Sequence, residues 1–234
     1  MNVRDFASRV TSIAALAEPV RRELYLYVVG QAAPVSREQA AAAVGVARHV
    51  AKFNLDKLED ENLLDVEYAR PSGRGGPGAG RPAKLYKRSG REVEVSLPER
   101  RYDLAAQVMA QAITQAEEQA VPIADALRDA ARDAGRTLAA EVQQKAGTRP
   151  SREGQIRAVQ DVLTEQGYQP RAAEDGGLAL ANCPFHALAQ AHSSLMCGVN
   201  LDLINSLVET AGPSDARAEL SPSPGMCCVR ITTA

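Results

Sequence analysis

The sequence predicts an α+β protein in which helices predominate over short antiparallel strands. Aromatic residues make up only 4% of the chain, tryptophan is absent and alanine is abundant, which favours helices over a β-sandwich or barrel. At 45%, apolar residues are frequent enough for packed cores in a chain of 234 residues. Short strand-like runs such as LLDVEY and CCVRIT interrupt the helical segments. We divide the chain into three parts, residues 1–96, 97–148 and 149–234.

The first part predicts short helices with clear boundaries. In EPVRRELYLYVVG, Pro19 suits a first helical turn and Gly30 suits a C-terminal cap. In SREQAAAAVGV, Ser36 and Gln39 have the spacing of a capping box, and Gly45 ends the helix about two turns later. A short helix, a glycine turn and another helix together form the outline of a helix-turn-helix.

The helix that follows this turn has one apolar face and one basic face. Ala51, Leu55 and Leu58 share the apolar face. Three residues that point away from the apolar face are the predicted contacts to base edges and phosphates: Arg48, His49 and Lys52. The alternative is an ordinary small helical domain that simply exposes its charges.

A glycine-rich basic segment follows the strand-like LLDVEY. From Arg70 to Arg91 the chain carries seven Arg or Lys residues and no acidic residue, although the whole protein has a formal net charge of −2. Arg74 and Arg81 lie among the glycines, and we predict that they contact DNA phosphates or the minor groove. A disordered basic linker is the alternative.

Residues 10–95 resemble the winged-helix bacterial regulators of the ArsR-like group in the order of their elements, which is helix, helix-turn-helix, strand, Gly/Arg loop and strand. The segment GRPAKLY is similar to their wing motif. The resemblance implies an N-terminal winged helix-turn-helix domain and a double-stranded DNA operator as partner.

The middle part, residues 97–148, predicts a helical connector. It consists almost entirely of helix formers, and Pro122 is its one internal breaker, so we expect two helices that meet near residues 120–123. Leu104 and Val108 begin an apolar stripe on the first helix, and Ile123 and Leu127 begin one on the second. Because these stripes are narrow, we expect them to pack against a second copy in a homodimer. The alternative is packing against the C-terminal part.

The last part predicts a capped helix that begins after Ser151, two short strands, further helices and two more strands. Together these elements form an α+β unit with a small antiparallel sheet.

The chain offers no signal peptide and no run of about 18 apolar residues, so we predict a cytoplasmic protein without a membrane span. Clustered cysteines in a reducing compartment are more often metal ligands or redox thiols than disulfides.

All four cysteines, Cys183, Cys197, Cys227 and Cys228, lie in this last part. Cys183 precedes a predicted helix, whose N-terminus would favour the thiolate form. Strand alternation places Cys227 on the core face and Cys228 on the outer face. An unbroken helix from residue 184 would carry Cys197 about 20 Å away from Cys183, so a shared site requires a break near residues 192–194.

The segments CPF and PGMCCVRI, with Cys197 between them, resemble the sensor half of SufR-type iron–sulfur repressors. The terminal strand is also similar to 4-vinyl-reductase-type sensor domains. The SufR resemblance implies a [4Fe-4S] cluster held by Cys183, Cys197 and Cys227. That family has a further cysteine before the last one, whereas residues 198–226 contain none. The fourth ligand would then be Cys228, His186, His192 or an exogenous group.

These observations predict a DNA-binding transcriptional regulator, expected to be a repressor, that senses iron–sulfur or redox status. Zinc, haem or a small organic effector is the alternative ligand, and buried cysteines that act as small apolar residues are the structural alternative. An enzyme with Cys183 as nucleophile and His186 as base would need an orienting acid, and none is evident. We therefore predict that the protein is not an enzyme.

Overall fold

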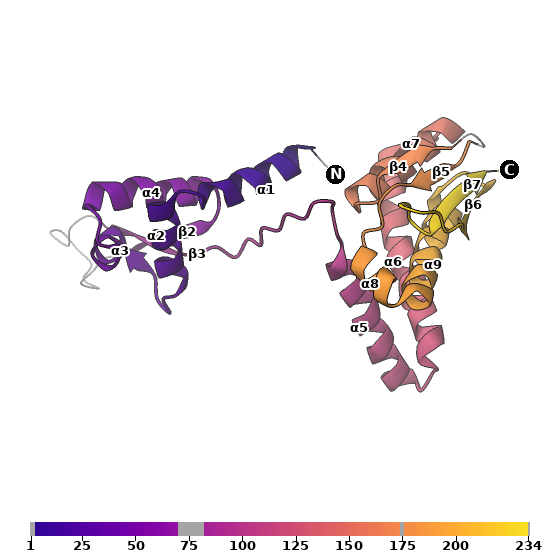
Figure 1. Ribbon diagram of the computed structural model, residues 1–234, viewed down its shortest axis with the longest axis horizontal. Coiled ribbons are helices and arrows are strands. Elements are labelled where there is room, and N and C mark those ends of the chain that lie inside the picture. The colour runs from indigo at the N-terminus through magenta and orange to yellow at the C-terminus, as the bar shows by residue number, and fades with distance from the viewer. Residues whose placement is uncertain (1–2, 70–81, 174–175, 234) are drawn as a thin grey trace. The chain divides into compact units, whose positions relative to one another are not determined.

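The computed structural model describes residues 3–69, 82–173 and 176–233. The chain forms two compact units, the N-terminal unit Val3–Val95 and the C-terminal unit Ser96–Ala234 (Figure 1). Helices predominate in both, and the sheets are small and antiparallel, so the predicted α+β class is confirmed. No helix in the described ranges is both long enough and apolar enough to cross a membrane.

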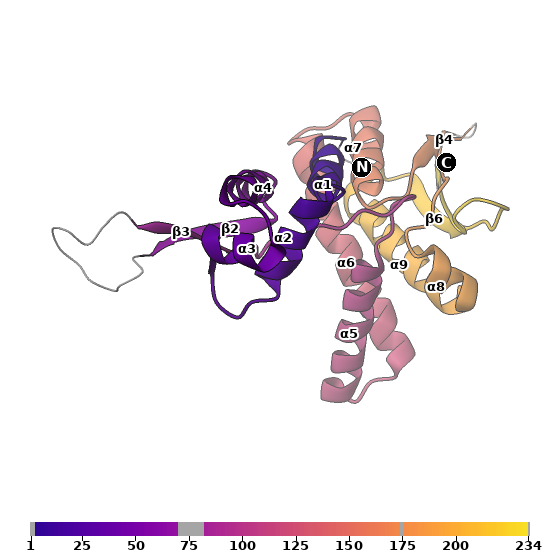
Figure 2. The same cartoon turned by 60° about the vertical axis from the view of Figure 1, so that its left-hand side comes forward.

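The N-terminal unit contains four helices and a three-stranded antiparallel sheet within its described residues. Its elements in chain order are α1 (Val3–Ala15), α2 (Pro19–Val29), β1 (Val35–Ser36), α3 (Arg37–Val44), α4 (Arg48–Asp60), β2 (Leu64–Ala69) and β3 (Ala83–Arg88). The strand order is β1-β3-β2, with Val66 opposite Tyr86 in the β2–β3 pair. Helix α4 packs against β2, and Figure 2 shows it nearly end-on beside the β2–β3 hairpin.

The predicted helix boundaries of this unit are confirmed, and the caps explain them. The hydroxyl of Ser36 accepts a hydrogen bond from the Gln39 amide, and the Gln39 side chain accepts one from the Ser36 amide. Gly45 ends α3 at φ 74°, a left-handed conformation that glycine adopts without steric cost. The buried faces of α2 and α4 include Leu24, Leu55 and other apolar side chains that form one core with β2 and β3.

Two elements of this unit were not predicted. Helix α1 precedes the helix that we expected to be the first, although Asp5 in its first turn and the spacing of Phe6, Val10 and Ile13 are typical of an amphipathic helix. Strand β1 is only two residues long, and its pairing with β3 supplies hydrogen bonds that no local pattern reveals.

The C-terminal unit contains five helices and a four-stranded antiparallel sheet in its described part. Its elements are α5 (Tyr102–Gln119), α6 (Ile123–Ala146), α7 (Arg152–Glu165), β4 (Pro170–Ala172), β5 (Leu178–Leu180), α8 (His186–Ala191), α9 (Ser193–Ala211), β6 (Ala216–Leu220) and β7 (Val229–Thr233). The strand order is β4-β5-β7-β6, with Leu178 opposite Ile231. The predicted cap is confirmed, because the Ser151 hydroxyl accepts from the Gly154 amide at the start of α7.

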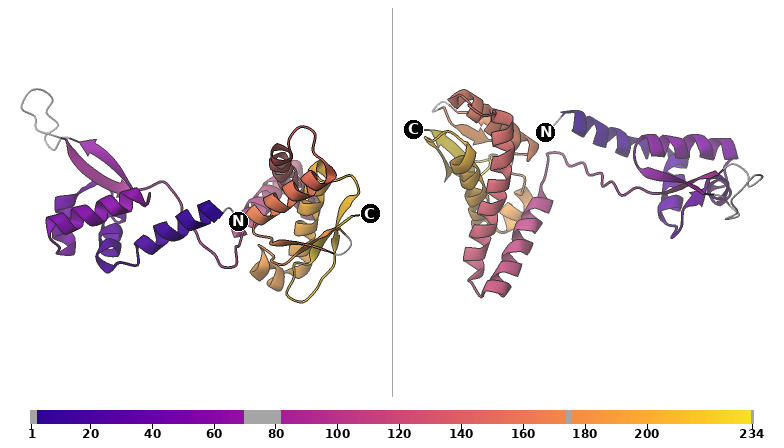
Figure 3. Two further views of the ribbon diagram at one scale, coloured as in Figure 1. Left: turned by 90° about the horizontal axis from the view of Figure 1, so that it is seen from above. Right: turned by 180° about the vertical axis from the view of Figure 1, so that it is seen from behind.

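The two predicted connector helices are present as α5 and α6, and they form an antiparallel hairpin (Figure 3). The expectation that an alanine-rich stripe buries little against its own chain is wrong. Helix α6 packs on α9, and its buried face consists mainly of small residues: Ala126, Ala130, Ala131, Gly135, Leu138, Ala139 and Val142. Ile123, which we expected on the buried stripe, is 48% exposed. Small side chains let two helix backbones approach closely, so this stripe forms the core of the unit.

Candidate functional site

Helix α4 presents a basic surface in its N-terminal half. The side chains of Arg48 and Lys52 are 62% and 56% exposed, and His49 is also exposed. They remain outside because Ala51, Leu55 and Leu58 occupy the buried face, as predicted. Each of the two cations has a carboxylate partner within the unit. Arg48 pairs with Glu38 on α3, and Lys52 pairs with Asp56 at 2.9 Å between Nζ and Oδ2.

A groove of about 930 Å³ lies beside this surface, between α3, the start of α4 and the β2–β3 hairpin. Arg48 and Lys52 line it from α4, whereas Tyr68 and Lys84 line it from the two strands. Tyr68 is 67% exposed. The groove therefore combines two cations from a helix with one cation and an aromatic ring from a hairpin.

Asp56 connects α4 to β3 at the floor of this groove. Its carboxylate accepts hydrogen bonds from Lys84 Nζ at 2.8 Å, from the Tyr86 hydroxyl at 2.7 Å and from Lys52 Nζ at 2.9 Å. Burial raises the pKa of Asp56, but the hydrogen bonds from these three donors outweigh burial and lower the pKa to about 2. The carboxylate thus positions the hairpin against the helix.

We expect the N-terminal unit to lose stability as the pH falls from about 4 towards 2. The pKa of Asp56 is lower in the folded chain than its ordinary value of 3.8, so folding favours the ionised carboxylate, and this contribution is lost on protonation. Because solvent screens a partly exposed pair, we expect a loss of about 1 kcal/mol. Urea denaturation at several pH values measures it. Asp56→Asn should weaken this pH dependence, whereas Asp60→Asn, at an exposed carboxyl on the same helix, should preserve it.

Two predicted DNA contacts, Arg74 and Arg81, lie outside the described residues. One exposed residue of α4 was missed by the sequence analysis. The side chain of Phe53 is 66% exposed, although phenylalanine is an apolar residue. Its position four residues after His49 on the outer face of the helix was a usable signal.

In the C-terminal unit, Cys183 lies in a tightly held loop between β5 and α8. The Asn182 side chain donates to the carbonyl oxygens of Gly167 at 2.6 Å and Glu99 at 3.0 Å. The Arg100 guanidinium donates to the Cys183 carbonyl at 3.1 Å, and the Arg101 amide donates to the carbonyl that follows it, at 3.0 Å. The cysteine loop is therefore bonded directly to residues 99–101, the segment in which the chain enters the C-terminal unit.

Three of the four cysteine side chains gather in this unit. The Cys183 thiol donates to the sulfur of Cys227, and Cys227 also bonds with Cys228. The hydrogen bond to Cys227, together with burial, raises the pKa of Cys183 far above its ordinary value. For Cys227, the bond from Cys183 lowers the pKa, but the bond to Cys228 and burial raise it to about 11. These contacts favour the protonated thiol at Cys183 over the expected thiolate, because its partner is another thiol and its surroundings are buried.

The strand alternation of the last cysteines is confirmed. Cys227 is 3% exposed and lies on the side of the buried Val229 and Ile231, whereas Cys228 is partly exposed. Strand β7 begins only at Val229, yet the Cys227 amide already donates to the Leu180 carbonyl of β5 at 2.8 Å. This bond holds Cys227 beside the strand that leads to Cys183.

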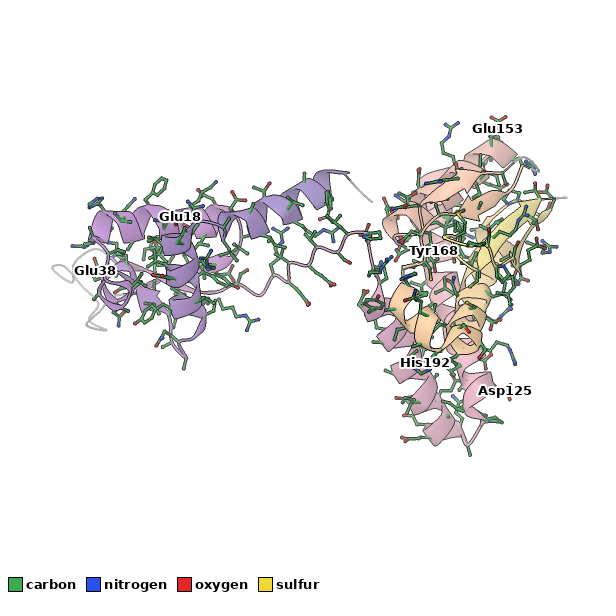
Figure 4. All side chains as sticks on the ribbon, viewed as in Figure 1. Glu18, Glu38, Asp125, Glu153, Tyr168 and His192 are labelled. Atoms are coloured by element: carbon green, nitrogen blue, oxygen red, sulfur yellow. The ribbon has the colours of Figure 1, made fainter. Side chains whose placement is uncertain are left out.

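A buried polar chain that was not predicted ends at the thiols. Asn200 on α9 donates to the Cys227 sulfur at 3.2 Å and accepts from the hydroxyl of Tyr168. Tyr168 is fully buried, its ring meets Phe185 edge to face at 6.4 Å, and it lies inside the unit in Figure 4. Burial raises the pKa of Tyr168 well above its ordinary value, so the hydroxyl stays protonated and donates. Sequence reasoning missed both residues because their partners are distant along the chain.

The other predicted ligands are placed differently. The helix breaks at His192, where φ is −137°, so the break expected near residues 192–194 is confirmed. His186 and His192 are exposed, and Figure 4 shows His192 near the junction of α8 and α9. Cys197 is partly buried on α9, one helical turn before Asn200. Among the described residues, no three His, Cys, Asp or Glu side chains form a group that could hold a metal ion.

Comparisons with known proteins identify no relative of this chain. No protein-family model, no curated protein sequence and no solved structure matches the chain. Its function has to be argued from its own residues.

Proposed function

We propose that the protein is a DNA-binding transcriptional regulator, most simply a repressor, whose N-terminal unit is a winged helix-turn-helix domain. One observation carries the proposal: α3, the glycine turn at Gly45 and α4 are followed by the β2–β3 hairpin, and the exposed cations of α4 face a groove that this hairpin borders. A helix whose basic N-terminal half is exposed suits the major groove of DNA. The Gly and Arg residues between the two hairpin strands, in the segment 70–81, would contact the backbone or the minor groove.

DNA selection tests this proposal. The full chain is mixed with a pool of random duplexes, bound fragments are amplified through several rounds, and the affinity of the enriched sequence is measured over a range of salt concentrations. We expect an enriched motif and an affinity that falls steeply with salt, because Lys and Arg contacts release counterions from DNA. A pool that remains random, with no binding even at low salt, would contradict the proposal.

We also propose a homodimer, which would present two copies of α4 to a palindromic operator. The buried faces of α5 and α6 are already occupied within the chain. The dimer would instead use apolar side chains that this hairpin leaves exposed, Ile113 and Ile123, which are 53% and 48% exposed. Sedimentation equilibrium measures the mass directly, and a monomer at micromolar concentration would contradict the proposal.

We propose that the thiols of the C-terminal unit are the sensor, with a [4Fe-4S] cluster on Cys183, Cys197 and Cys227 as their ligand and zinc as the alternative. Two observations support a shared site. Cys183 contacts Cys227, and Cys197 lies one helical turn from Asn200, which bonds to the Cys227 sulfur. The fit is incomplete, because Cys197 and the two histidines do not join the thiols in a metal-holding group within the described residues. The hydrogen bonds between residues 99–101 and the cysteine loop would connect such a site to the chain segment that leads from the N-terminal unit.

The visible absorption spectrum of protein purified without oxygen tests the cluster. We expect a broad band near the blue edge of the visible range, with about four iron and four sulfide per chain. Cys183→Ser and Cys227→Ser should remove the band, and Cys228→Ser should preserve it unless Cys228 is the fourth ligand. Far-UV circular dichroism verifies that each variant folds. Wild-type protein that stays colourless after anaerobic reconstitution with iron and sulfide would exclude the cluster, and zinc analysis of the same sample tests the alternative.

A further inference from the structure

Phe53 is an exposed apolar ring at the edge of the basic surface of α4. It is 66% exposed on α4, next in sequence to the exposed Lys52 and four residues after the exposed His49. The ring faces outward because the opposite face of the helix carries the buried Ala51, Asn54, Leu55 and Leu58. The ring therefore lies on the outer face of the helix that the proposed function assigns to DNA, where it is available for contact with a bound duplex.

The charges around Phe53 indicate what kind of surface covers it. The N-terminal half of α4 carries Arg48, His49 and Lys52, while the carboxylates of this helix begin only at Asp56. Arg48 and Lys52 pair with Glu38 and Asp56, and an apolar protein surface would have to bury these ion pairs, which is costly. A duplex supplies phosphates for the cations and, in the major groove, the 5-methyl group of thymine for the ring. Among the four bases, thymine alone presents a methyl group there.

We propose that Phe53 is a specificity residue that recognises the 5-methyl group of thymine in the DNA site of this protein. The inference rests on the proposed DNA-binding function and adds the base and the atom group that are recognised. The ring makes no hydrogen bond, so it selects thymine by van der Waals contact with the methyl group and by exclusion of water from it. Lys52 and Arg48 hold the helix on the adjacent phosphates or base edges.

The experiment uses the full chain and the duplex enriched by selection. Each thymine is replaced in turn by deoxyuridine, which keeps the base pair and removes only the methyl group. Wild-type protein should lose affinity about 3- to 10-fold at one or two positions, consistent with loss of one or two buried methyl contacts. Phe53→Ala should bind the thymine duplex more weakly by the same factor and should bind both duplexes equally. Leu26→Ala, at another exposed apolar residue of the unit, 59% exposed on α2, should behave as wild type.

The outcomes separate this inference from the proposed function. Tight binding of the enriched duplex without any effect of deoxyuridine would overturn the role of Phe53 and keep DNA binding. Retained discrimination between thymine and deoxyuridine in Phe53→Ala would also overturn it, because another residue would then contact the methyl group. Absence of any DNA binding by folded wild-type protein would overturn both proposals.

Discussion

Replacement of Gly135 by alanine is expected to destabilise the C-terminal unit by about 2 kcal/mol or more, although alanine is the better helix former. Gly135 lies where α6 crosses α9. A Cβ atom at this position would be 2.3 Å from the Leu203 carbonyl oxygen and 2.8 Å from the Ser206 Cβ. Both contacts are shorter than van der Waals separation, and one is to backbone, so the two helices would have to move apart. Separation would also strain the bond from the Ser206 hydroxyl to the Arg132 carbonyl, which is 2.8 Å long.

A second helical glycine provides the matched control. Gly198 lies in α9, and a Cβ atom there would meet nothing within 4 Å. Gly198→Ala should therefore stabilise the unit by about 0.5 to 1 kcal/mol, the ordinary gain for this exchange in a helix. Urea denaturation followed by far-UV circular dichroism compares both variants with wild type. Equal effects of the two substitutions would show that α6 and α9 do not pack as closely as described.

This helix contact also marks the limit of what the sequence predicts for the fold. The local signals were sufficient where a structure is determined within a few residues, as in the capping box of Ser36 and Gln39 or the break between α8 and α9 at His192. The partner of α6 is not a local property. An alanine-rich stripe is equally compatible with a second copy and with α9, and only the close approach at Gly135 distinguishes them.

The candidate thiol site also combines features that local sequence predicts with features that depend on distant residues. Alternation along CCVRIT was sufficient to predict that Cys227 is buried and that Cys228 is more exposed. The state of the Cys183 thiol was not predictable, because it depends on the sulfur of Cys227, which lies 44 positions later in the chain. Asn200 and Tyr168 were missed for a similar reason, since a buried amide is recognisable only through the partners that it meets.

Removal of both cations from α4, in Arg48→Ala/Lys52→Ala, is expected to weaken binding to the enriched duplex about 100-fold at moderate salt. It should also reduce the slope of log affinity against log salt by about two, because each phosphate contact contributes about 0.9. In the free protein these cations pair with Glu38 and Asp56. The pairs are exposed and therefore weak, so phosphates can replace the carboxylates.

The control for this variant removes two exposed cations on another helix that are also paired with carboxylates. Arg128 and Arg136 on α6 are 55% and 53% exposed, and each pairs with an aspartate three residues earlier, Asp125 and Asp133. Arg128→Ala/Arg136→Ala changes the net charge by the same amount, so a general effect of charge on DNA binding would appear equally in both variants. If the DNA interface lies on α4, only the Arg48→Ala/Lys52→Ala protein should bind DNA more weakly and show a smaller dependence of log affinity on log salt concentration. Equal slopes for the two variants would place the DNA contacts on another surface.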